Sequence, residues 1–271
     1  MPELPEVETT RRGLEPLVVG RRIGSVSIRQ HQLRWPVAEE LAHCPGSTIR
    51  ALERRAKWLL WRFDTGTILW HLGMSGSFRS WPQPPLPGPH DHIDVVIGDT
   101  HTIRFTDPRR FGAVLWQPGD DPFEHPRLRG LGPEPLGPDF NGDALWRRSR
   151  GRKTRVKQFI MDSANVVGVG NIYAAEALFA AGIHPRRAAG RVARARYARL
   201  AEAIRDTLRR AVEVGGTSLR NFTVGDGTPG YFGQELRVYG KTGRPCPACG
   251  GVLKGGVIGQ RSTVWCPRCQ R

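Results

Sequence analysis

The chain has 271 residues, and its 41 lysines and arginines exceed its 25 acidic residues, giving a formal net charge of +16 and an isoelectric point of about 10.8. Enzymes that act on small metabolites rarely need such an excess, so it favours a polyanionic partner, most simply nucleic acid; an arginine-rich proteome would give a similar balance. The length suits two domains. No apolar run approaches the ~18 residues of a membrane span and no signal peptide is evident, which predicts a cytoplasmic protein without a membrane partner.

The first half of the chain is predicted to be one helix followed by β-strands. Apolar residues recur at helical spacing over residues 3–17, with Glu3 and Glu6 near one face of that helix. Alternating and β-branched residues separated by turn signals then predict strands. Two hairpins are expected, one from residues 58–63 and 68–72 and the other from residues 93–97 and 103–105.

The second half is predicted to be helical. Prolines and glycines dominate residues 117–140 and indicate a passage between domains. Helices are then expected near 156–160, over 171–181 and over 197–212, and the glycine-rich residues 217–233 are expected to form a mobile loop. The predicted division is a domain over 1–130, a linker over 131–145, a helical domain over 146–238 and a cysteine module over 239–271.

Two cysteine pairs are the strongest local pattern. Cys246-Pro-Ala-Cys249 and Cys266-Pro-Arg-Cys269 supply four thiolates, with enough residues between the pairs for a hairpin. Because cytoplasmic cysteines favour metal binding over disulfides, we predict one tetrahedral Zn²⁺; a redox pair of thiols is the alternative. Four protein ligands leave no open position, so the zinc would be structural. Cys44 is predicted to be a small buried hydrophobe.

The start of the chain carries a possible nucleophile. Removal of Met1, which a small second residue favours, would expose the secondary amine of Pro2. Such an amine can form an imine at a sugar carbon, and with a reference pKa of about 7.7–8.0 roughly a tenth to a sixth of it is neutral at pH 7. Glu3 and Glu6 would raise that pKa, whereas the positive end of the following helix would lower it.

Several shorter motifs are weak when taken separately. Residues 166–173 place two glycines and Asn171 at a helix start, where backbone amides can hold a phosphate; a tight turn that needs glycine is the alternative. The hairpin between the cysteine pairs carries Arg261 near its tip, which suits contacts with a nucleic-acid backbone. The histidines of His-Asp-His at 90–92 are more often hydrogen-bonded or exposed than metal ligands.

Taken together, six motifs in unbroken order resemble the formamidopyrimidine-DNA glycosylase family. The resemblance implies an α+β fold, with an N-terminal helix and two-layered β-sandwich followed by a helix–two-turn–helix domain and a zinc-finger β-hairpin. It implies a bacterial, monomeric enzyme of base-excision repair that removes oxidised purines from double-stranded DNA and then cleaves the abasic strand by β,δ-elimination. The motifs are Pro-Glu-Leu-Pro-Glu-Val-Glu at 2–8, Arg-Ala-Lys at 55–57, His-Leu-Gly-Met-Ser-Gly at 71–76, Asp-Pro-Arg-Arg-Phe-Gly at 107–112, Val-Gly-Val-Gly-Asn-Ile-Tyr at 167–173 and the four-cysteine finger.

The resemblance also implies a role for each matching residue. Pro2 would attack the anomeric carbon and form a Schiff base, and Glu3 would transfer protons with support from Glu6. Lys57 and Arg261 would act at the sugar and phosphates of the lesion. Contacts with DNA are implied for His71, Met74, His92, Arg109, Arg110, Phe111, Lys157, Asn171 and Tyr231.

Within that implied set, two groups have distinct tasks. Met74, Arg109 and Phe111 would form the wedge that replaces the extruded nucleotide, with Arg109 facing a cytosine. Tyr231 lies in the loop that would close over the extruded base.

Two other interpretations are open. An endonuclease VIII-like enzyme would prefer oxidised pyrimidines, but its opening differs from this one and the wedge residues resemble those of the purine enzyme. A non-catalytic zinc-ribbon DNA-binding protein would explain the charge and the finger. It gives no reason for Glu3, Glu6 and Lys57 together with a processed Pro2.

Overall fold

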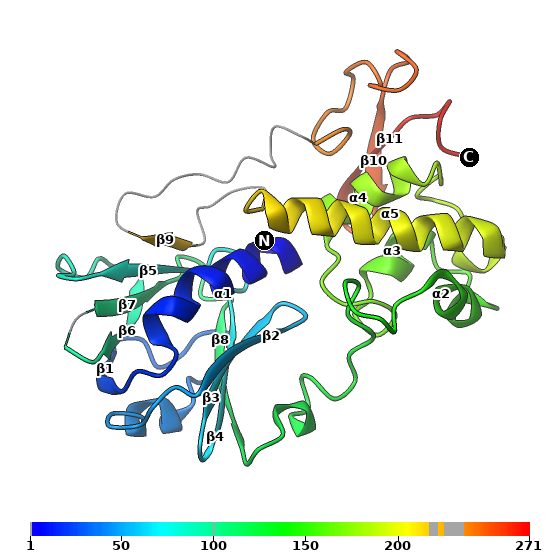
Figure 1. Ribbon diagram of the computed structural model, residues 1–271. Helices are drawn as coiled ribbons and strands as arrows, with labels where there is room; N and C mark the ends of the chain where they lie inside the picture. The colour runs from blue at the N-terminus through cyan, green and yellow to red at the C-terminus, as the bar shows by residue number, and fades with distance from the viewer. Residues whose placement is uncertain (1, 100, 217–221, 225–235) are drawn as a thin grey trace. The chain divides into compact units, whose positions relative to one another are not determined.

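The computed structural model describes residues 2–99, 101–216, 222–224 and 236–271. The chain forms two compact units (Figure 1), the first comprising Met1–Gly130 with Gly215–Tyr231 and the second Leu131–Val214 with Phe232–Arg271. The boundaries expected from the sequence, with their linker, remain predictions. No helix among the described residues is both long and apolar enough to span a membrane.

Helix α1 (Leu4–Val18) begins with a locked first turn, and the helix expected at the start of the chain is confirmed. Glu3 is the N-cap, and its backbone N–H donates to the Glu6 carboxylate at 2.8 Å within a capping box. Farther along the helix, Arg54 donates to the Glu8 carboxylate at 2.9 Å and ties α1 to the β-sandwich. The start of the chain is therefore held on a rigid element.

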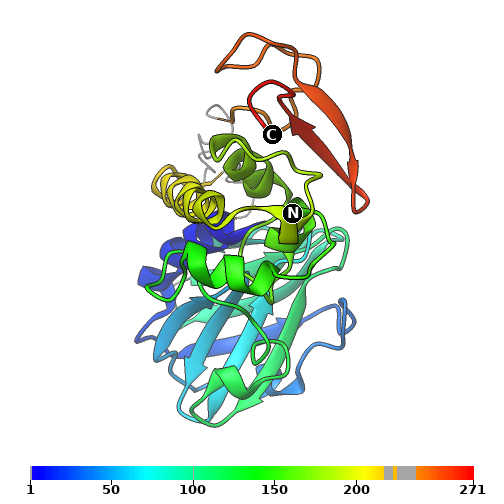
Figure 2. The same ribbon diagram turned by 90° about the vertical axis from the view of Figure 1, so that its right-hand side faces the viewer.

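Two sheets form the sandwich of the first unit, seen from two directions in Figures 1 and 2. The five-stranded sheet has the order β1-β6-β7-β5-β9 and the four-stranded sheet the order β2-β3-β4-β8. Both expected hairpins are confirmed, as the antiparallel pairs β3–β4 and β6–β7. The strands are β1 (Ile23–Ile28), β2 (Ala51–Arg55), β3 (Trp58–Phe63), β4 (Gly66–His71), β5 (Ser77–Trp81), β6 (Asp91–Ile97), β7 (His101–Thr106), β8 (Ala113–Pro118) and β9 (Phe222–Val224).

Aromatic side chains fill the space between the two sheets. Trp61 and Trp70 on the four-stranded sheet are buried, as are Phe78 and Phe105 on the five-stranded sheet. The Trp70 ring centroid lies 5.2 Å from that of Phe78 and 5.5 Å from that of Phe105, within the range of attractive ring contacts. The core of the first unit is thus built from both layers.

Strand β9 corrects one expectation. Residues 217–233 were predicted to be a mobile loop, but Phe222–Val224 pairs in parallel with β5, the only parallel pair among the described strands. Phe, Thr and Val favour strands, yet a run of three in a glycine-rich stretch is too short to be recognised without its partner. The pairing returns the chain to the first unit after it has passed through the second.

A buried ion pair lies on the five-stranded sheet. Arg104 and Asp94 face each other across β6 and β7, with Nε to Oδ1 at 2.8 Å and Nη2 to Oδ2 at 2.9 Å. Arg29 donates to the same carboxylate, and the carbonyl of Pro85 accepts from Arg104. Burial alone would raise the pKa of Asp94, but its hydrogen bonds and opposite charges outweigh burial and lower the pKa below 3.8.

The second unit is mainly helical. The expected helices are confirmed as α3 (Val156–Met161), α4 (Asn171–Ala180) and α5 (Arg194–Glu213), and a hairpin of β10 (Lys254–Ile258) and β11 (Arg261–Trp265) follows. Helix α2 (Gly142–Ser149) was not expected. The residue that could have predicted its start is the N-cap Asn141, whose side chain accepts from the N–H of Ala144 at 2.9 Å. Short 3₁₀ turns complete the fold at η1 (Glu39–His43), η2 (Pro122–Glu124) and η3 (Ala189–Arg191).

The Arg104–Asp94 pair generates a stability prediction. Arg104→Met should lower the free energy of unfolding of the first unit by about 1.5–3 kcal/mol, because the Asp94 carboxylate loses its charged hydrogen bonds to Arg104 but keeps those to Arg29. Urea denaturation followed by tryptophan fluorescence measures this. Arg50→Met is the matched control: the Arg50–Asp64 pair is mostly exposed and screened by solvent, so its loss should leave the free energy of unfolding close to that of the wild type.

The same pair predicts a pH dependence. Because the folded-state pKa of Asp94 is lowered, its contribution is fully present above the unfolded-state pKa and is lost as the pH falls through the folded value. The stability difference between the wild type and Arg104→Met should therefore shrink below about pH 4. A difference that is constant from pH 7 to pH 3 would contradict this assignment.

Candidate active site and zinc finger

Two buried carboxylates flank the start of α1. Glu3 is 2% exposed and Glu6 is 5% exposed, and Pro2 immediately precedes them at a buried position. Gly216 approaches the same turn with φ of +82°; a Cβ there would lie 3.0 Å from Glu6 Oε1. A glycine is required for this approach, because a side chain would be strained by the backbone conformation and pressed against the carboxylate.

Lys57 and His71 lie close to each other at one edge of two neighbouring elements of the four-stranded sheet, the β2–β3 turn and the end of β4. Lys57 lies in the β2–β3 turn beside Trp58, and Trp58 pairs with His71 on β4. Burial, and then the charges of Lys57 and Arg34, lower the pKa of His71 to about 4. The ring is therefore neutral at pH 7. Its Nδ1 accepts from the N–H of Gly73 at 2.9 Å, so the ring proton lies on Nε2.

Two loops bring the predicted wedge residues to the surface. Gly73 has φ of +61°, and a Cβ there would lie 2.3 Å from the backbone of Phe111, so only glycine allows the loops to meet. Met74 and Phe111 are 40% and 42% exposed, which is unusual for large apolar side chains. The Arg109 guanidinium lies over the Phe111 ring at 4.9 Å from its centroid.

A buried carboxylate joins those two loops. Asp107 accepts from Ser75 Oγ at 2.5 Å and from the N–H of Gly112 at 2.7 Å, and Ser75 Oγ accepts from the N–H of Arg109 at 3.1 Å. Arg110 adopts φ of +53° in this turn. Sequence reasoning missed the roles of Ser75 and Asp107, although both lie inside the motifs that carried the resemblance.

His92 and Lys157 occupy buried positions. His92 is buried, and its Nε2–H donates to the carbonyl of Asp107 at 2.8 Å. Lys157 is also buried, and its Nζ donates to the carbonyl of Ser262 at 2.9 Å and to Thr263 Oγ1 at 2.7 Å. The contact with DNA expected for both remains a prediction; without DNA, each side chain supports a neighbouring backbone segment.

Helix α4 carries a possible anion site at its first residue. Asn171 follows the buried segment 166–170, where Gly168 has φ of +79°. Its Oδ1 is buried and has no hydrogen-bond partner among the described residues. The helix start supplies N–H groups and the positive end of the dipole, as anion binding requires. Tyr231, the remaining predicted contact, lies outside the described residues.

Glu176 on the same helix was not identified from the sequence. Its carboxylate accepts from three successive N–H groups, those of Arg237, Val238 and Tyr239, at 2.8 to 2.9 Å. The signal was a single acid in the otherwise apolar helix Asn-Ile-Tyr-Ala-Ala-Glu-Ala-Leu-Phe-Ala. Glu176 thereby anchors the chain where it enters the zinc finger.

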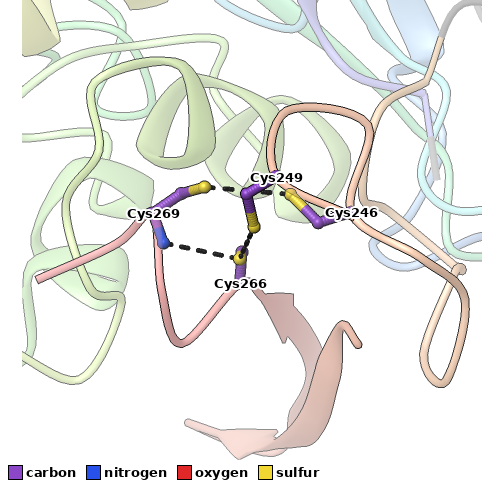
Figure 3. Close-up of side chains that lie close together, drawn as sticks. All are labelled: Cys246, Cys249, Cys266 and Cys269. Atoms are coloured by element: carbon purple, nitrogen blue, oxygen red, sulfur yellow. Dashed lines mark hydrogen bonds between the residues drawn. The ribbon is translucent and has the colours of Figure 1, made fainter. Parts of the chain in front are cut away.

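The four predicted zinc ligands converge on one point (Figure 3). Their sulfur atoms lie within 4.8 Å of one another, with Cys249 to Cys266 at 3.5 Å and Cys246 to Cys269 at 3.9 Å. A tetrahedral site with Zn–S bonds of about 2.3 Å needs sulfur separations of about 3.8 Å, so the cluster fits zinc. The site holds one structural Zn²⁺, which stiffens the hairpin.

The hairpin presents Arg261 directly after its turn. Gly259 and Gln260 form the two-residue turn with φ of +55° and +61°, as a type I′ turn requires. Arg261 is exposed at the first position of β11. The buried ammonium of Lys157 fixes the next two residues of β11, so the hairpin is tied to α3 at its tip.

The cysteine cluster generates a second prediction. Cys249→Ala should abolish stoichiometric zinc binding, loosen the β10–β11 hairpin and weaken DNA binding, while the first unit stays folded. Zinc content by mass spectrometry and hydrogen exchange of each segment measure this. Cys44→Ala is the control, because burial raises the pKa of the Cys44 thiol to about 11 and keeps it from acting as a thiolate ligand. DNA affinity unchanged after zinc loss would show that the finger is dispensable.

Comparisons with known proteins agree along the whole chain. Residues 1–114 match the formamidopyrimidine-DNA glycosylase N-terminal domain, residues 131–223 the H2TH domain of the same enzyme, and residues 243–271 a zinc finger found in FPG and IleRS. A formamidopyrimidine-DNA glycosylase from Stutzerimonas stutzeri is 57% identical over 272 residues, which covers all of both chains.

Solved structures show the same likeness. Lactococcus lactis Fpg bound to DNA containing an abasic site superposes with a TM-score of 0.91 at 31% identity over 99% of both chains. A MutM protein in complex with DNA containing carbocyclic 8-oxo-G gives 0.91 at 32% identity over all of both chains. This chain therefore belongs to the formamidopyrimidine-DNA glycosylase family, a family of DNA glycosylases with AP lyase activity.

Proposed function

We propose that this protein excises oxidised purines from duplex DNA through a Schiff base at Pro2 and then cleaves the abasic strand. The observation that carries the proposed chemistry is the pair of almost wholly buried carboxylates, Glu3 and Glu6, next to Pro2. Buried acids beside a potential amine are costly for folding and are typical of proton-transfer sites. Relatives solved with abasic-site and 8-oxo-G DNA support the class of substrate.

The proposed reaction begins after Met1 has been removed. The Pro2 nitrogen attacks C1′ of the extruded nucleotide, the bond to the base breaks, and the base leaves with a proton. Glu3 donates and accepts protons at the sugar, and Glu6 holds the Glu3 N–H in place. The C1′–O4′ bond then opens, with Glu3 delivering a proton to O4′, and an iminium between Pro2 and C1′ remains. The iminium makes the C2′ proton acidic, so the 3′-phosphate leaves by β-elimination; a second elimination then releases the 5′-phosphate.

Four residues would hold the phosphates around the extruded nucleotide. Lys57 supplies a positive charge from the β2–β3 turn, and neutral His71 donates through Nε2–H, as its low pKa and the Gly73 contact require. Asn171 offers its side-chain amide at the start of α4, and Arg261 offers a guanidinium from the hairpin turn. His71 would donate this hydrogen bond throughout the neutral pH range, because it becomes charged only near pH 4.

Met74 and Phe111 would enter the stack that the extruded nucleotide leaves. Both are apolar and exposed without DNA, which suits side chains that replace lost stacking. Arg109 lies over Phe111 and would face the orphaned base, where its donors suit the acceptors of cytosine. Arg110, exposed in the same turn, would contact the backbone. A monomer acting on DNA in the bacterial cytoplasm completes the proposal.

Borohydride trapping tests the nucleophile. Protein lacking Met1 and mixed with an 8-oxoguanine:cytosine duplex should give a covalent adduct at stoichiometric yield, located by mass spectrometry on the peptide that starts at Pro2. Protein that retains Met1 is the control and should trap nothing, because its Pro2 nitrogen is an amide. An adduct on a lysine would overturn the role of Pro2. Trapping with thymine glycol but not 8-oxoguanine would favour the endonuclease VIII-like alternative.

Ser75→Ala tests the wedge. The substitution removes one of the hydrogen bonds to Asp107 and the acceptor for Arg109 N–H, so both wedge loops should loosen. Hydrogen bonds to charged groups contribute about 1.5–3 kcal/mol, so the Kd for a lesion duplex should rise about tenfold or more. A 2-aminopurine reporter beside the lesion measures extrusion. Ser80→Ala is the matched control, because Ser80 Oγ has no hydrogen-bond partner among the described residues.

A further inference from the structure

Two arginine-rich segments of the second unit are joined along their backbones. The N–H of Gly190 donates to the carbonyl of Arg152 at 2.9 Å, that of Ala189 to Thr154 at 2.8 Å, and that of Val156 to Arg187 at 2.7 Å. These bonds place residues 147–155 against residues 186–191, although more than thirty positions separate them in the chain. Helix α2 and the first turns of α5 adjoin the pair within this unit.

The joined segments carry many cations and almost no acid. Residues 141–160 contain seven arginines and lysines and residues 182–200 contain six, against the single acid Asp143. All of these cations except Lys157 and Arg196 are exposed. Asp143 is already paired with Arg194 at 2.7 Å. We call the exposed arginines and lysines of residues 147–155 and 186–199 the arginine strip.

Charges of the strip act on two titratable groups beside it, Arg196 and His184. The pKa of Arg196 is lowered by burial and then by the neighbouring charges of Arg187 and Arg199. The pKa of His184 is lowered by burial and then by Arg186 and Arg187. The strip therefore disfavours further positive charge beside it, and a bound polyanion would relieve that repulsion.

The chemistry of the strip favours phosphates over other partners. No large apolar side chain in the strip is exposed, so it lacks the anchors of a protein interface or of a membrane-binding face. A guanidinium group can donate two parallel hydrogen bonds to two oxygens of one phosphate. Arg186 also lies over Trp265 at 4.9 Å from its ring centroid, so the strip is continuous with β11 of the finger.

We propose that the arginine strip is a sequence-independent binding surface for the phosphate backbone of undamaged duplex DNA beyond the lesion nucleotides. It shares no residue with the groups assigned above to the extruded nucleotide. This proposal rests on the proposed function in one respect only: it assumes that the polyanion bound by the protein is DNA. The arginine strip would help the protein to search undamaged DNA and would lengthen the stretch of duplex that the protein contacts. It would take no part in the chemical steps.

The test uses a variant with Lys153, Arg155, Arg187 and Arg191 each changed to Gln. Among the described residues, the structure shows no side-chain hydrogen bond or ion pair of these four, so the fold should persist. The control changes Arg21, Arg50, Arg129 and Arg209 to Gln, which lowers the net charge by the same amount outside the strip. Binding is measured on an undamaged duplex of about three helical turns and on a lesion duplex of about one turn, from low to physiological salt.

The strip variant should bind the long undamaged duplex at least about tenfold more weakly at low salt, and its salt slope should fall by about 0.9 for each phosphate that the variant no longer neutralises. It should excise from the short lesion duplex at the wild-type rate when DNA is saturating, and its Tm at low salt should rise because repulsion is relieved. Equal losses in both variants, or unchanged binding by the strip variant, would overturn the proposal. Loss of binding to polyglutamate with DNA binding intact would assign the strip to an acidic protein and would also overturn it.

The experiment separates this proposal from the proposed function. If the wild type excised no oxidised purine but still bound undamaged DNA through the strip, the proposed function would fail and the strip would stand.

Discussion

The hydrogen bond from the Glu3 backbone to the Glu6 carboxylate determines where the start of the chain lies. It closes the first turn of α1, so Pro2 precedes a fixed helix end instead of a fraying terminus. The helix is in turn tied to the sandwich through Glu8 and Arg54. A nucleophile made from the chain's own amine needs such an arrangement, because it has no side chain of its own to position it. Glu3, proposed to transfer protons, and Glu6, proposed to support it, are thus also the residues that build the site.

Buried carboxylates organise more than the first turn. Asp107 joins the two loops of the wedge, Asp94 pairs with Arg104 inside a sheet, and Glu176 binds three N–H groups at the entry to the finger. Each is acceptor-rich and is satisfied by several donors, so the cost of burial is offset. The excess positive charge lies instead on the surface, where it is available to a polyanion. The buried carboxylates therefore hold parts of the fold together, whereas the surface arginines and lysines are available to bind a polyanion.

The sequence predicts the elements whose signals are local. The two hairpins, the helices α1, α3, α4 and α5 and the zinc ligands follow from periodicity, turn residues and cysteine spacing. Strand β9 does not, because its three residues become a strand only beside β5. The burial of His92 and Lys157 could not be predicted from the sequence either. A motif does not show whether a side chain donates to a ligand or to a carbonyl group of the protein. Ser75 and Glu176 accept hydrogen bonds from backbone N–H groups 34 and 61 to 63 residues away, and these partners cannot be read from the sequence.

The buried ammonium of Lys157 has a consequence for how the second unit unfolds. Its acceptors lie on β11, so a hairpin that left α3 would deprive a water-free charge of two partners at once. Partial detachment is therefore more costly than either the fully seated or the fully unfolded arrangement. The finger and α3 should behave as one cooperative unit, which opens in a single step and reseats Arg261 whenever it closes.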